Sequence, residues 1–393
     1  MYDVLIVGCG LAGMTVAREL ADNGYKILII EKRNHISGNI YDKIDEDGFL
    51  VQIYGPHCFF TNNGEIKSFV EKYIAVDDCF VKCRTVINRK KLPMPFNFTS
   101  IDLIYDEERA SKLKKKLVDE YNKEIVSVTD LLESKDEEIR DFGVYLYKNE
   151  YTLYSSKQWG LDISQISPEV FKRVPVYLSY RDMYQSHKYQ FLPRGGFTKF
   201  ATSLLDSKNI EIRLGVDALR EGIVRVVDND IICNIDGIEC NIPVLFTGEL
   251  DALMKYKYGI LPYRSLEFVW KHLDVDSYQE TEIVAYPQAD KITRVTEYKK
   301  LPRQEKKGET KISIEFPVPY TPGQPIGTEP YYPIKNNEND ALYLKYLKEA
   351  SKISNLFLCG RLADYKYYNM DEVIVRAWNV SEKIKKYFCD KNL

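Results

Sequence analysis

Residues 4–13 constrain the fold more than any other part of the chain. Residues 4–7 are apolar and rich in β-branched side chains, and they lead into the glycine series Gly8, Gly10 and Gly13. A helix-periodic stretch follows to Asn23, so the segment predicts a strand, a tight turn and a helix. The first glycine permits the turn, the second lets a pyrophosphate approach the backbone, and the third lets helix and strand pack closely. The segment therefore predicts a dinucleotide-binding βαβ unit.

An acidic residue follows at the spacing that a ribose contact needs. A second apolar strand, predicted over residues 26–30, ends in Glu31, where a carboxylate can accept hydrogen bonds from a ribose. The N–H groups and the dipole of the intervening helix favour the phosphates. A purely structural βαβ unit is the alternative, and the glycines together with the acid favour a bound dinucleotide.

Composition excludes several other classes of protein. The chain has 393 residues, enough for two or three lobes, and its net charge of −3 offers no basic field for nucleic acid. Its eight cysteines and four histidines form no zinc-ligand spacing, so we expect no metal site and reduced thiols in a cytoplasmic protein. No apolar run approaches the roughly eighteen residues of a membrane helix, so we expect no membrane span.

The remaining sequence divides into segments with a helical pattern and segments with a strand pattern. From about Asp102 to Leu146, apolar residues recur at three- and four-residue spacings, which predicts several short helices. Segments 210–248 and 264–316 alternate and are rich in β-branched residues, which predicts antiparallel sheet. Residues 356–360 repeat the strand-to-glycine pattern, and a helix is predicted from about 370 to 387. A chain that begins and ends with such elements is expected to build its first domain from separate pieces.

We therefore expect an α/β fold with three parts. The first is a discontinuous Rossmann-like dinucleotide-binding domain of residues 1–75, 195–250 and 335–393. The second is a mostly helical insertion over residues 76–172, with a mobile substrate loop near 160–176. The third is an antiparallel sheet domain of residues 173–194 and 251–334 that faces the substrate.

The end of the chain discriminates between NAD and FAD. A late strand closes in Gly360-Arg361, and the helix that follows can point its N-terminus at a flavin. Such a helix end stabilises negative charge at the pyrimidine side of a reduced flavin. The insertion-rich architecture also suits FAD better than a simple dehydrogenase, so FAD is the expected cofactor.

Motifs along essentially the whole chain match one family in unbroken order. They are Gly8-Cys-Gly-Leu-Ala-Gly13, Glu31-Lys-Arg-Asn-His-Ile-Ser-Gly-Asn39, Tyr54-Gly-Pro-His57, Leu92-Pro-Met-Pro-Phe-Asn97, Lys157-Gln-Trp-Gly160, Lys172-Arg-Val-Pro175, Pro193-Arg-Gly-Gly-Phe-Thr198, Tyr263-Arg-Ser-Leu266, Thr293-Arg294, Glu329-Pro-Tyr-Tyr-Pro333 and Gly360-Arg-Leu-Ala-Asp-Tyr-Lys-Tyr-Tyr-Asn-Met370. Together they resemble the bacterial UDP-galactopyranose mutases.

The resemblance implies an FAD-dependent isomerase that acts in surface polysaccharide synthesis. In that family, N5 of the reduced flavin attacks the anomeric carbon of a nucleotide-bound pyranose, and the ring recloses on the flavin-bound sugar as a furanose. The implied partners are a nucleotide-sugar substrate, an external reductant such as NAD(P)H, and a second copy of the chain in a homodimer.

The resemblance also implies the residues of the site. Arg173 and Arg294 resemble the two arginines that clamp the diphosphate, and His57 resembles the histidine beside the flavin. Their alternatives are ordinary ion pairs for the arginines and a structural role for the histidine. The implied substrate-binding positions are Tyr154, Trp159, Tyr184, Tyr332, Tyr367, Phe60 and Asn369, with packing as the alternative for the tyrosines. The implied cofactor-binding positions are Gly8, Gly10, Leu11, Gly13, Glu31, Lys32, Gly38, Asn39, Arg361, Met370 and Val373.

Several positions depart from the family pattern, mostly on the substrate side. Phe60 stands where the family usually has a second histidine, and Asn369 stands where it usually has an aspartate. Glu150 falls where an aromatic commonly stacks on uracil, although the adjacent Tyr151 could substitute. Ser155 and Ser156 replace a Thr-Glu or similar pair near the uridine, and Ser37 replaces a glycine at the flavin. We therefore expect the reaction type to be kept, while the sugar could be deoxygenated or modified and the base could belong to dTDP, GDP or CDP.

Two other classes of protein share the start of this fold. A flavin amine oxidase or desaturase would perform net hydride transfer, but the arginine and tyrosine set suits a diphosphate better than an amine. A non-enzymatic relative of the GDP-dissociation inhibitor type would need no flavin, which the glycines, Glu31 and Arg361 argue against.

Overall fold

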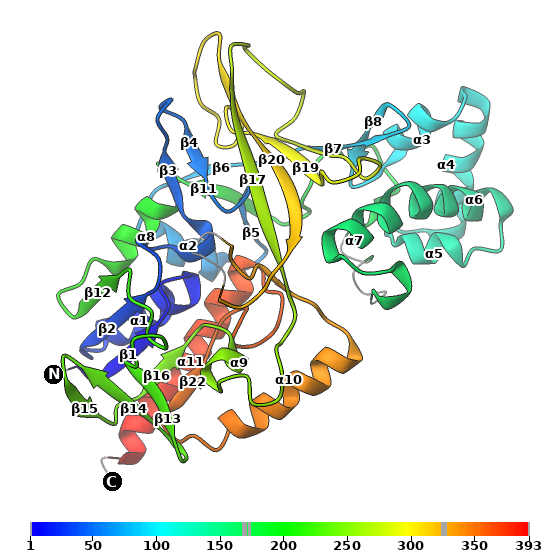
Figure 1. Ribbon diagram of the computed structural model, residues 1–393. Coiled ribbons are helices and arrows are strands. Elements are labelled where there is room, and N and C mark those ends of the chain that lie inside the picture. The colour runs from blue at the N-terminus through cyan, green and yellow to red at the C-terminus, as the bar shows by residue number, and fades with distance from the viewer. Residues whose placement is uncertain (1, 167–170, 172–173, 324–327, 392–393) are drawn as a thin grey trace.

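A five-stranded parallel sheet forms one end of the molecule, at the lower left of Figure 1. The computed structural model describes residues 2–166, 171, 174–323 and 328–391. The strands, in spatial order, are β12 (Ile210–Leu214), β2 (Ile27–Glu31), β1 (Val4–Val7), β16 (Val244–Phe246) and β22 (Leu356–Leu358). All neighbours pair in parallel, and β2 is buried along its whole length, as expected for a strand covered on both faces.

Helices and a small sheet cover the two faces of the parallel sheet. Val4 and Ile6 of β1 pack toward α1 (Leu11–Asp22), α8 (Phe197–Leu205) and α11 (Met370–Lys391), while Leu5 packs on the opposite side. That opposite side is covered by α9 (Leu250–Leu253), α10 (Asn337–Ala350) and a meander of β13 (Val224–Val227), β14 (Asp230–Ile235) and β15 (Ile238–Cys240). Because side chains alternate along β1, this one strand contributes to the hydrophobic cores on both faces of the sheet.

The expectation of antiparallel sheet over residues 210–248 was wrong at both ends of that segment. Only β13, β14 and β15 pair antiparallel, whereas β12 and β16 belong to the parallel sheet. The strand β12 lies at the edge of that sheet and has no fully buried residue. Its polar and apolar residues alternate for that reason, and alternation is also the signal of an antiparallel strand.

A seven-stranded sheet runs through the middle of the molecule and carries much of the site. In spatial order its strands are β21 (Tyr332–Pro333), β17 (Tyr263–Leu273), β20 (Thr310–Pro319), β19 (Arg294–Glu297), β18 (Ile283–Ala285), β7 (Cys83–Ile87) and β8 (Lys90–Met94). All pairs are antiparallel except that of β18 with β7. The antiparallel sheet expected over residues 264–316 is thus confirmed, and the overall α/β fold with it.

Smaller elements join the two large sheets. The strand β11 (Tyr189–Pro193) lies between β5 (Phe59–Thr61) and β6 (Val76–Asp78), and β3 (Asp42–Ile44) pairs with β4 (Leu50–Gln52). The helix α2 (Gly64–Glu71) and the short 3-10 turn η1 (Gly38–Ile40) complete this region. Residues 76–94, which we expected at the start of the helical insertion, instead form the strands β6, β7 and β8 of these sheets.

The helical part follows directly. It consists of α3 (Phe98–Ile104), α4 (Glu107–Tyr121), α5 (Val128–Leu132), α6 (Glu137–Leu146), the π-helical turn η2 (Tyr147–Tyr151), α7 (Thr152–Trp159) and the 3-10 turn η3 (Ile163–Gln165). The strands β9 (Ile125–Val126) and β10 (Val176–Tyr177) pair beside it. Four of these helices begin at an Asn, Asp or Ser whose side chain accepts a first-turn N–H, which is why short helices are stable here.

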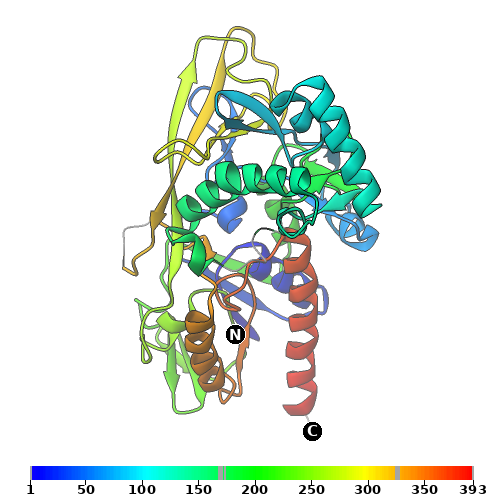
Figure 2. The ribbon, with the colours of Figure 1, turned by 90° about the vertical axis from the view of Figure 1, so that its right-hand side faces the viewer.

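The helical part stands over one end of the terminal helix. Figure 2 shows α11 with its N-terminal end directed toward the helical part and its C-terminal end directed away. None of the described helices combines the length and the apolar character that a membrane-spanning segment needs.

Candidate active site

A cavity of about 1130 Å³ opens where the parallel strands end. The turn after β1, the end of β2 and residues 37–39 line one side of it, and the residues after β22 line the other. All of the expected cofactor residues except Gly13 line this cavity: Gly8, Gly10, Leu11, Glu31, Lys32, Gly38, Asn39, Arg361, Met370 and Val373. The carboxyl ends of parallel strands are where nucleotides bind in folds of this kind.

The glycines of the cradle permit close backbone contacts that side chains would block. A Cβ on Gly8 would lie 2.0 Å from Oγ1 of Thr247, and one on Gly13 would lie 2.1 Å from the Gly8 carbonyl oxygen. A Cβ on Gly38 would lie 2.7 Å from the Gly10 Cα. Gly13 therefore packs α1 against the turn without lining the cavity itself. The first turn of α1, which Gly10 leaves open to an anion, fits a pyrophosphate.

Glu31 is held by the backbone on both sides. Its Oε2 accepts the N–H of Cys9 at 2.7 Å, and its Oε1 accepts the N–H of Arg33 at 2.9 Å. The carboxylate is therefore fixed beside the glycine turn and lines the cavity, as a ribose contact requires. The glycine cradle and this acid together fit a dinucleotide.

A second cation, the buried Arg33, lies next to the expected cofactor residue Lys32 and was missed from the sequence. Nη2 of Arg33 donates to Asn39 Oδ1 at 2.9 Å and forms an ion pair with Glu329 Oε2 at 2.9 Å, and Lys32 Nζ lies 3.4 Å from the same oxygen. Burial raises the pKa of Glu329, but Arg33 and Lys32 outweigh it and hold that pKa at about 2. Within the described residues, Nε and Nη1 of Arg33 have no partner although they are buried. The Lys-Arg pair directly after Glu31 was the available signal.

Ser37, the neighbour of this cluster, has a strained backbone. Its φ of 79° lies in the left-handed region, where glycine is the favoured residue. Its side chain is fully buried at the wall of the cavity. The departure from glycine at this position therefore adds local strain and a hydroxyl at the cofactor side.

His57 lines the same cavity as a neutral imidazole. Burial, with smaller contributions from Arg361 and Arg294, lowers the pKa of His57 to about 4 despite a bond to the Gly55 carbonyl. Nδ1 lies 2.8 Å from that carbonyl oxygen, so the neutral ring donates there and keeps Nε2 as an acceptor. The Gln52 side chain fixes the position by bonding both the backbone N–H and the backbone carbonyl of His57.

Arg294 brings a permanent positive charge from the large sheet. It lies on β19 directly opposite Glu315 of β20, and both Nε and Nη2 lie 2.7 Å from Glu315 Oε2. Burial lowers the pKa of Arg294, but Glu315 and nearby tyrosines outweigh that effect and raise it well above the ordinary value. The side chain keeps an exposed fraction of 21%, against 2% for Glu315. Glu315 thus orients the guanidinium, and part of the Arg294 side chain stays accessible to a ligand.

Aromatic side chains from three different elements gather around Arg294 and Arg361. The rings of Tyr332 and Tyr367 stack with centroids 5.7 Å apart, and Trp159 of α7 meets Tyr332 at 6.1 Å. The Arg361 guanidinium lies 4.6 Å from the centre of the Tyr367 ring. Burial raises the pKa values of Tyr154 and Tyr184, both of which lie close enough to Arg294 to feel its charge.

This arrangement suits a dianionic ligand. Guanidinium groups hold phosphate oxygens through charge-assisted hydrogen bonds, and phenol hydroxyls donate further ones. The expected substrate residues Tyr154, Trp159, Tyr184, Tyr332 and Tyr367 are therefore brought together with Arg294.

The Lys157-Gln-Trp-Gly160 motif docks α7 onto the large sheet. Nζ of Lys157 donates to the carbonyls of Tyr286 (2.8 Å), Ala289 (2.5 Å) and Ile292 (2.8 Å). Arg264 donates to the Gln158 carbonyl, and a Cβ on Gly160 would lie 2.7 Å from Arg264. The motif is thereby explained as the joint that places Trp159 beside Tyr332.

Arg294 and the aromatic residues around it do not themselves line the described cavity, and the remaining expected positions lie apart from it or outside the described residues. Phe60 packs on His187, with ring centroids 4.7 Å apart, and is absent from the described lining of the cavity. The N–H of Asn369 donates to Glu372 at the start of α11. Tyr151 is buried in the helical part, where its hydroxyl donates to Val174, so it does not present a free face there. Arg173 and part of the expected loop 160–176 lie outside the described residues.

Glu150 is a buried carboxyl at the joint between the helical part and the large sheet. Thr85 Oγ1 of β7 donates to its Oε2 at 2.5 Å, and only 4% of the residue is exposed. Burial raises the pKa of Glu150 to about 8, although Thr85 and Lys157 act in the opposite direction. The group is therefore largely protonated at neutral pH.

Glu150→Gln is expected to change how stability depends on pH. In the unfolded chain this carboxyl ionises near its ordinary pKa of 4.5, whereas in the folded chain it stays protonated until about pH 8. The wild type therefore loses stability as pH rises through this window, at about 1.4 kcal/mol per unit of pKa difference, and the variant does not. Melting temperatures from pH 5 to 9 should diverge in favour of the variant and level off above pH 8. Glu133→Gln, at an exposed site in the same part, is the control, and parallel profiles for wild type and Glu150→Gln would contradict the assignment.

Comparisons with known proteins agree with this geometry. The family model described as UDP-galactopyranose mutase matches residues 149–367, and one described as NAD(P)-binding Rossmann-like domain matches residues 6–73. The chain is 36% identical to UDP-galactopyranose mutase of Mycoplasma genitalium, over 98% of this chain and 95% of that protein. It is 33% identical to dTDP-fucopyranose mutase of Escherichia coli, over 96% of this chain and 97% of that protein.

Solved structures show the same fold. A reduced UDP-galactopyranose mutase superposes with a TM-score of 0.72 at 15% identity, covering 98% of this chain and 96% of that one. A putrescine oxidase superposes with a TM-score of 0.60 at 12% identity, covering 98% and 99%. At these identities the likeness concerns the fold alone.

Proposed function

The chain belongs to the UDP-galactopyranose mutase family, and we propose that it interconverts the pyranose and furanose forms of a nucleotide-diphospho-sugar with the help of reduced FAD. The observation that carries the proposal is the convergence of Arg294 with Tyr154, Tyr184 and Tyr332, next to His57 and Arg361, which line the cavity. Family membership favours this isomerase over the flavin amine oxidase and the non-enzymatic alternatives.

The cavity supports FAD as the dinucleotide. Gly8, Gly10 and the start of α1 would hold the pyrophosphate, and Glu31 would hold the ribose. The first turn of α11, at Met370 and Val373, would lie at the flavin. A reduced flavin, when bound, supplies the nucleophilic nitrogen that the anomeric carbon of the sugar requires.

Residues of this chain would stabilise the nucleoside diphosphate as it leaves. Departure of a nucleoside diphosphate leaves negative charge, which Arg294 stabilises with its fixed positive charge while Tyr184 and Tyr332 donate hydrogen bonds. Arg173 is proposed as the second cation of this clamp, from its motif position alone. His57 stays neutral and keeps an acceptor at the cavity.

A second candidate concerns the substrate rather than the reaction. Phe60 and Asn369 stand where the family usually has a histidine and an aspartate. One position expected on the sugar side therefore loses its polar group, and the other loses its charge. A 6-deoxy sugar needs fewer polar partners, and dTDP-fucopyranose mutase is among the full-length relatives. UDP-galactopyranose and a dTDP-linked 6-deoxy sugar are therefore the two substrates to compare. We further propose an external reductant such as NAD(P)H, a homodimer, and a role in surface polysaccharide synthesis.

Anaerobic turnover tests the proposal. The purified protein, reduced with dithionite, is incubated separately with UDP-galactopyranose, UDP-galactofuranose and the dTDP-fucose pair, and ring size is read by NMR. Ring interconversion in the reduced protein and none in the oxidised protein is the expected result. Oxygen consumption without any ring change would instead support the oxidase class.

Competition binding separates the two substrates. UDP, dTDP, GDP and CDP compete for the site of the same preparation, and the tightest competitor identifies the base. A clear preference for UDP with efficient turnover of UDP-galactofuranose would remove the deoxy-sugar candidate.

A further inference from the structure

Tyr184 lies on a segment that has no regular structure to hold it. The described residues 178–188, here called the Tyr184 segment, connect β10 to β11 and contain no helix or strand. Their backbone is tied to neighbouring segments only at separate points. At its two ends, the Leu178 N–H donates to the Glu124 carbonyl and the Lys188 N–H donates to Asn62 Oδ1, each at 2.8 Å. The Phe98 N–H donates to the Ser179 carbonyl at 2.9 Å, Asn97 Nδ2 donates to the Arg181 carbonyl at 2.7 Å, and the Tyr184 N–H donates to the Val81 carbonyl at 2.9 Å. Side-chain contacts must therefore contribute to its position.

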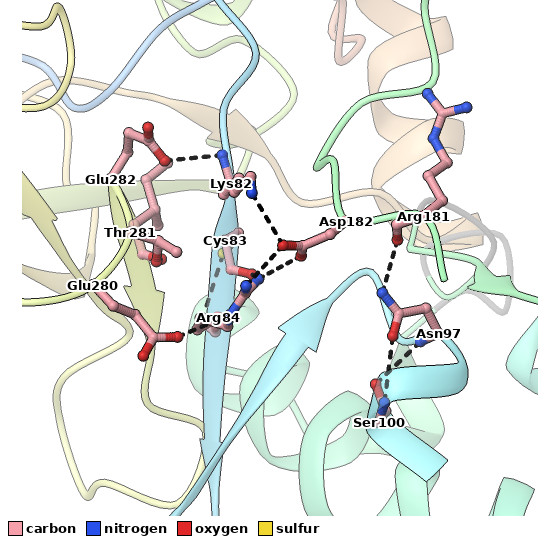
Figure 3. Close-up of polar contacts among 11 residues, drawn as sticks. Lys82, Cys83, Arg84, Asn97, Ser100, Arg181, Asp182, Glu280, Thr281 and Glu282 are labelled. Atoms are coloured by element: carbon pink, nitrogen blue, oxygen red, sulfur yellow. Dashed lines mark hydrogen bonds and ion pairs between the residues drawn. The ribbon is translucent and has the colours of Figure 1, made fainter. Parts of the chain in front are cut away.

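Arg84 of β7 supplies the strongest of these contacts. Its Nη1 and Nη2 donate to Oδ1 and Oδ2 of Asp182 at 2.6 and 2.8 Å, and its Nε donates to Glu280 at 3.0 Å. Figure 3 shows the guanidinium of Arg84 between Asp182 on one side and Glu280 on the other. Two parallel bonds fix direction as well as distance, unlike a single contact between point charges.

This ion pair differs from an ordinary surface pair in its surroundings. The exposed fraction is 15% for the Arg84 side chain and 33% for the Asp182 side chain, and Arg84 and Lys82 both lower the pKa of Asp182, Arg84 more strongly. Exposed pairs contribute about 0–1 kcal/mol because solvent screens them and both side chains lose freedom. Here the arginine is already held by Glu280 and by the Cys83 carbonyl, so less freedom remains to be lost.

The strand β7 connects this pair to the site. Arg84 points outward and holds Asp182, while the preceding residue, Cys83, is buried. The Tyr184 side chain, two residues after Asp182, lies near Cys83, Arg294 and Tyr367; burial raises the pKa of its hydroxyl, and the positive charge of Arg294 acts in the opposite direction. The strand β7 and the loop before it therefore fix the tyrosine, the strand through Arg84 and the Asp182 carboxylate and the loop through the Val81 carbonyl.

We propose that Arg84 and Asp182 are positioning residues that hold the Tyr184 hydroxyl ready for the diphosphate of the nucleotide sugar. This inference rests on the proposed function, because it assigns Tyr184 to the diphosphate. Neither Arg84 nor Asp182 touches the substrate. Their effect is preorganisation: Tyr184 does not have to be ordered at the moment of binding.

Hydrogen exchange tests the holding step without reference to any ligand. Arg84→Ala and Asp182→Asn are expected to speed exchange of the Tyr184 amide and its neighbours by roughly tenfold, as local opening becomes easier. The control is Arg213→Ala, which removes another bidentate pair, to Asp236 at 2.8 and 3.0 Å, far from the segment. Unchanged exchange in both test variants would overturn the proposal.

A double-mutant cycle tests whether the pair acts through Tyr184. Equilibrium binding of UDP and of dTDP is measured for Arg84→Ala, Tyr184→Phe and the double variant. If Arg84 acts through the tyrosine hydroxyl, each single change weakens binding by about tenfold and the double change by about tenfold as well, rather than about a hundredfold. In turnover, Arg84→Ala should lower kcat/KM by about the same factor as Tyr184→Phe, with no further loss in the double variant, because both changes remove the same hydrogen bond to the diphosphate.

Two further variants separate the charge of Arg84 from its geometry and its role from its effect on folding. Arg84→Lys retains the charge without the planar fork and should recover only part of the loss, and Asp182→Asn replaces Arg84→Ala if the latter fails to fold. Additive penalties in the cycle, with nucleotide binding intact in the wild type, would remove the role of Arg84 and leave the proposed function standing. A wild type that binds none of UDP, dTDP, GDP and CDP would remove the proposed function and this inference with it.

Discussion

Replacing Arg294 by alanine is expected to reduce kcat/KM for the preferred nucleotide sugar by roughly a thousandfold, because an oriented charge aimed at developing negative charge typically contributes a factor of about 10²–10³ or more. Glu315 orients Arg294 among the tyrosines, whereas Arg361, a neighbouring described cation, lies against the rings of Tyr332 and Tyr367. The measurement is anaerobic turnover with the reduced protein. Arg213→Ala removes an arginine of a distant ion pair and should be unaffected.

The same substitution also disturbs folding, and a second variant separates the two effects. Without Arg294, the Glu315 carboxylate stays buried with its main partner gone, which destabilises the fold by up to about 3 kcal/mol. Adding Glu315→Gln removes that unpaired charge and should restore the melting temperature without restoring turnover. Activity above about a tenth of the wild-type value in either variant would contradict the assigned role.

Gly38→Ala is expected to remove most of the bound cofactor. An added Cβ would lie 2.7 Å from the Gly10 Cα, so the two walls of the cradle must move apart. Overpacking of this kind costs about 1–3 kcal/mol, and a loss of about 1.4 kcal/mol in binding is tenfold in the dissociation constant. The measurement is flavin absorbance per chain after purification, followed by titration of the stripped protein with FAD.

Gly237→Ala is the matched control for this change. Gly237 also has a positive φ, of 83°, but a Cβ there would meet nothing within 4 Å. Both variants therefore carry backbone strain, and only Gly38→Ala adds a contact inside the cradle. Full flavin content in Gly38→Ala, or an equal loss in both variants, would show that the approach of Gly38 to Gly10 does not govern cofactor binding.

Local sequence patterns predicted those elements whose signals lie within one stretch of chain. The buried run of β1 and β2 with its glycine turn, the short helices from α3 to α6, and the antiparallel strands from β17 to β20 all carry such signals. The edge strand β12 misled the prediction because its alternating residues also fit an antiparallel neighbour.

The parts that escaped prediction are contacts between distant residues. Arg33 meets Glu329 across almost 300 positions (329 − 33 = 296), and neither residue carries a periodic signal. The burial of Glu150 against Thr85 likewise depends on how the helical part docks on the sheet. The site tyrosines could be grouped only through a family resemblance, because nothing in their spacing shows that Trp159, Tyr332 and Tyr367 face one another.

The order of strands in the parallel sheet has a consequence for biosynthesis. Its central strands, β1 and β16, are separated by more than 200 residues, and its far edge is β22 near the end of the chain. Arg361 and the beginning of α11, which line the cofactor cavity, come later still. Strand pairs so far apart in sequence form slowly, because the entropy cost of closing a long loop comes before the stabilising contacts form. On the ribosome, the nascent chain therefore cannot complete this cavity until the residues of α11 have emerged from the exit tunnel.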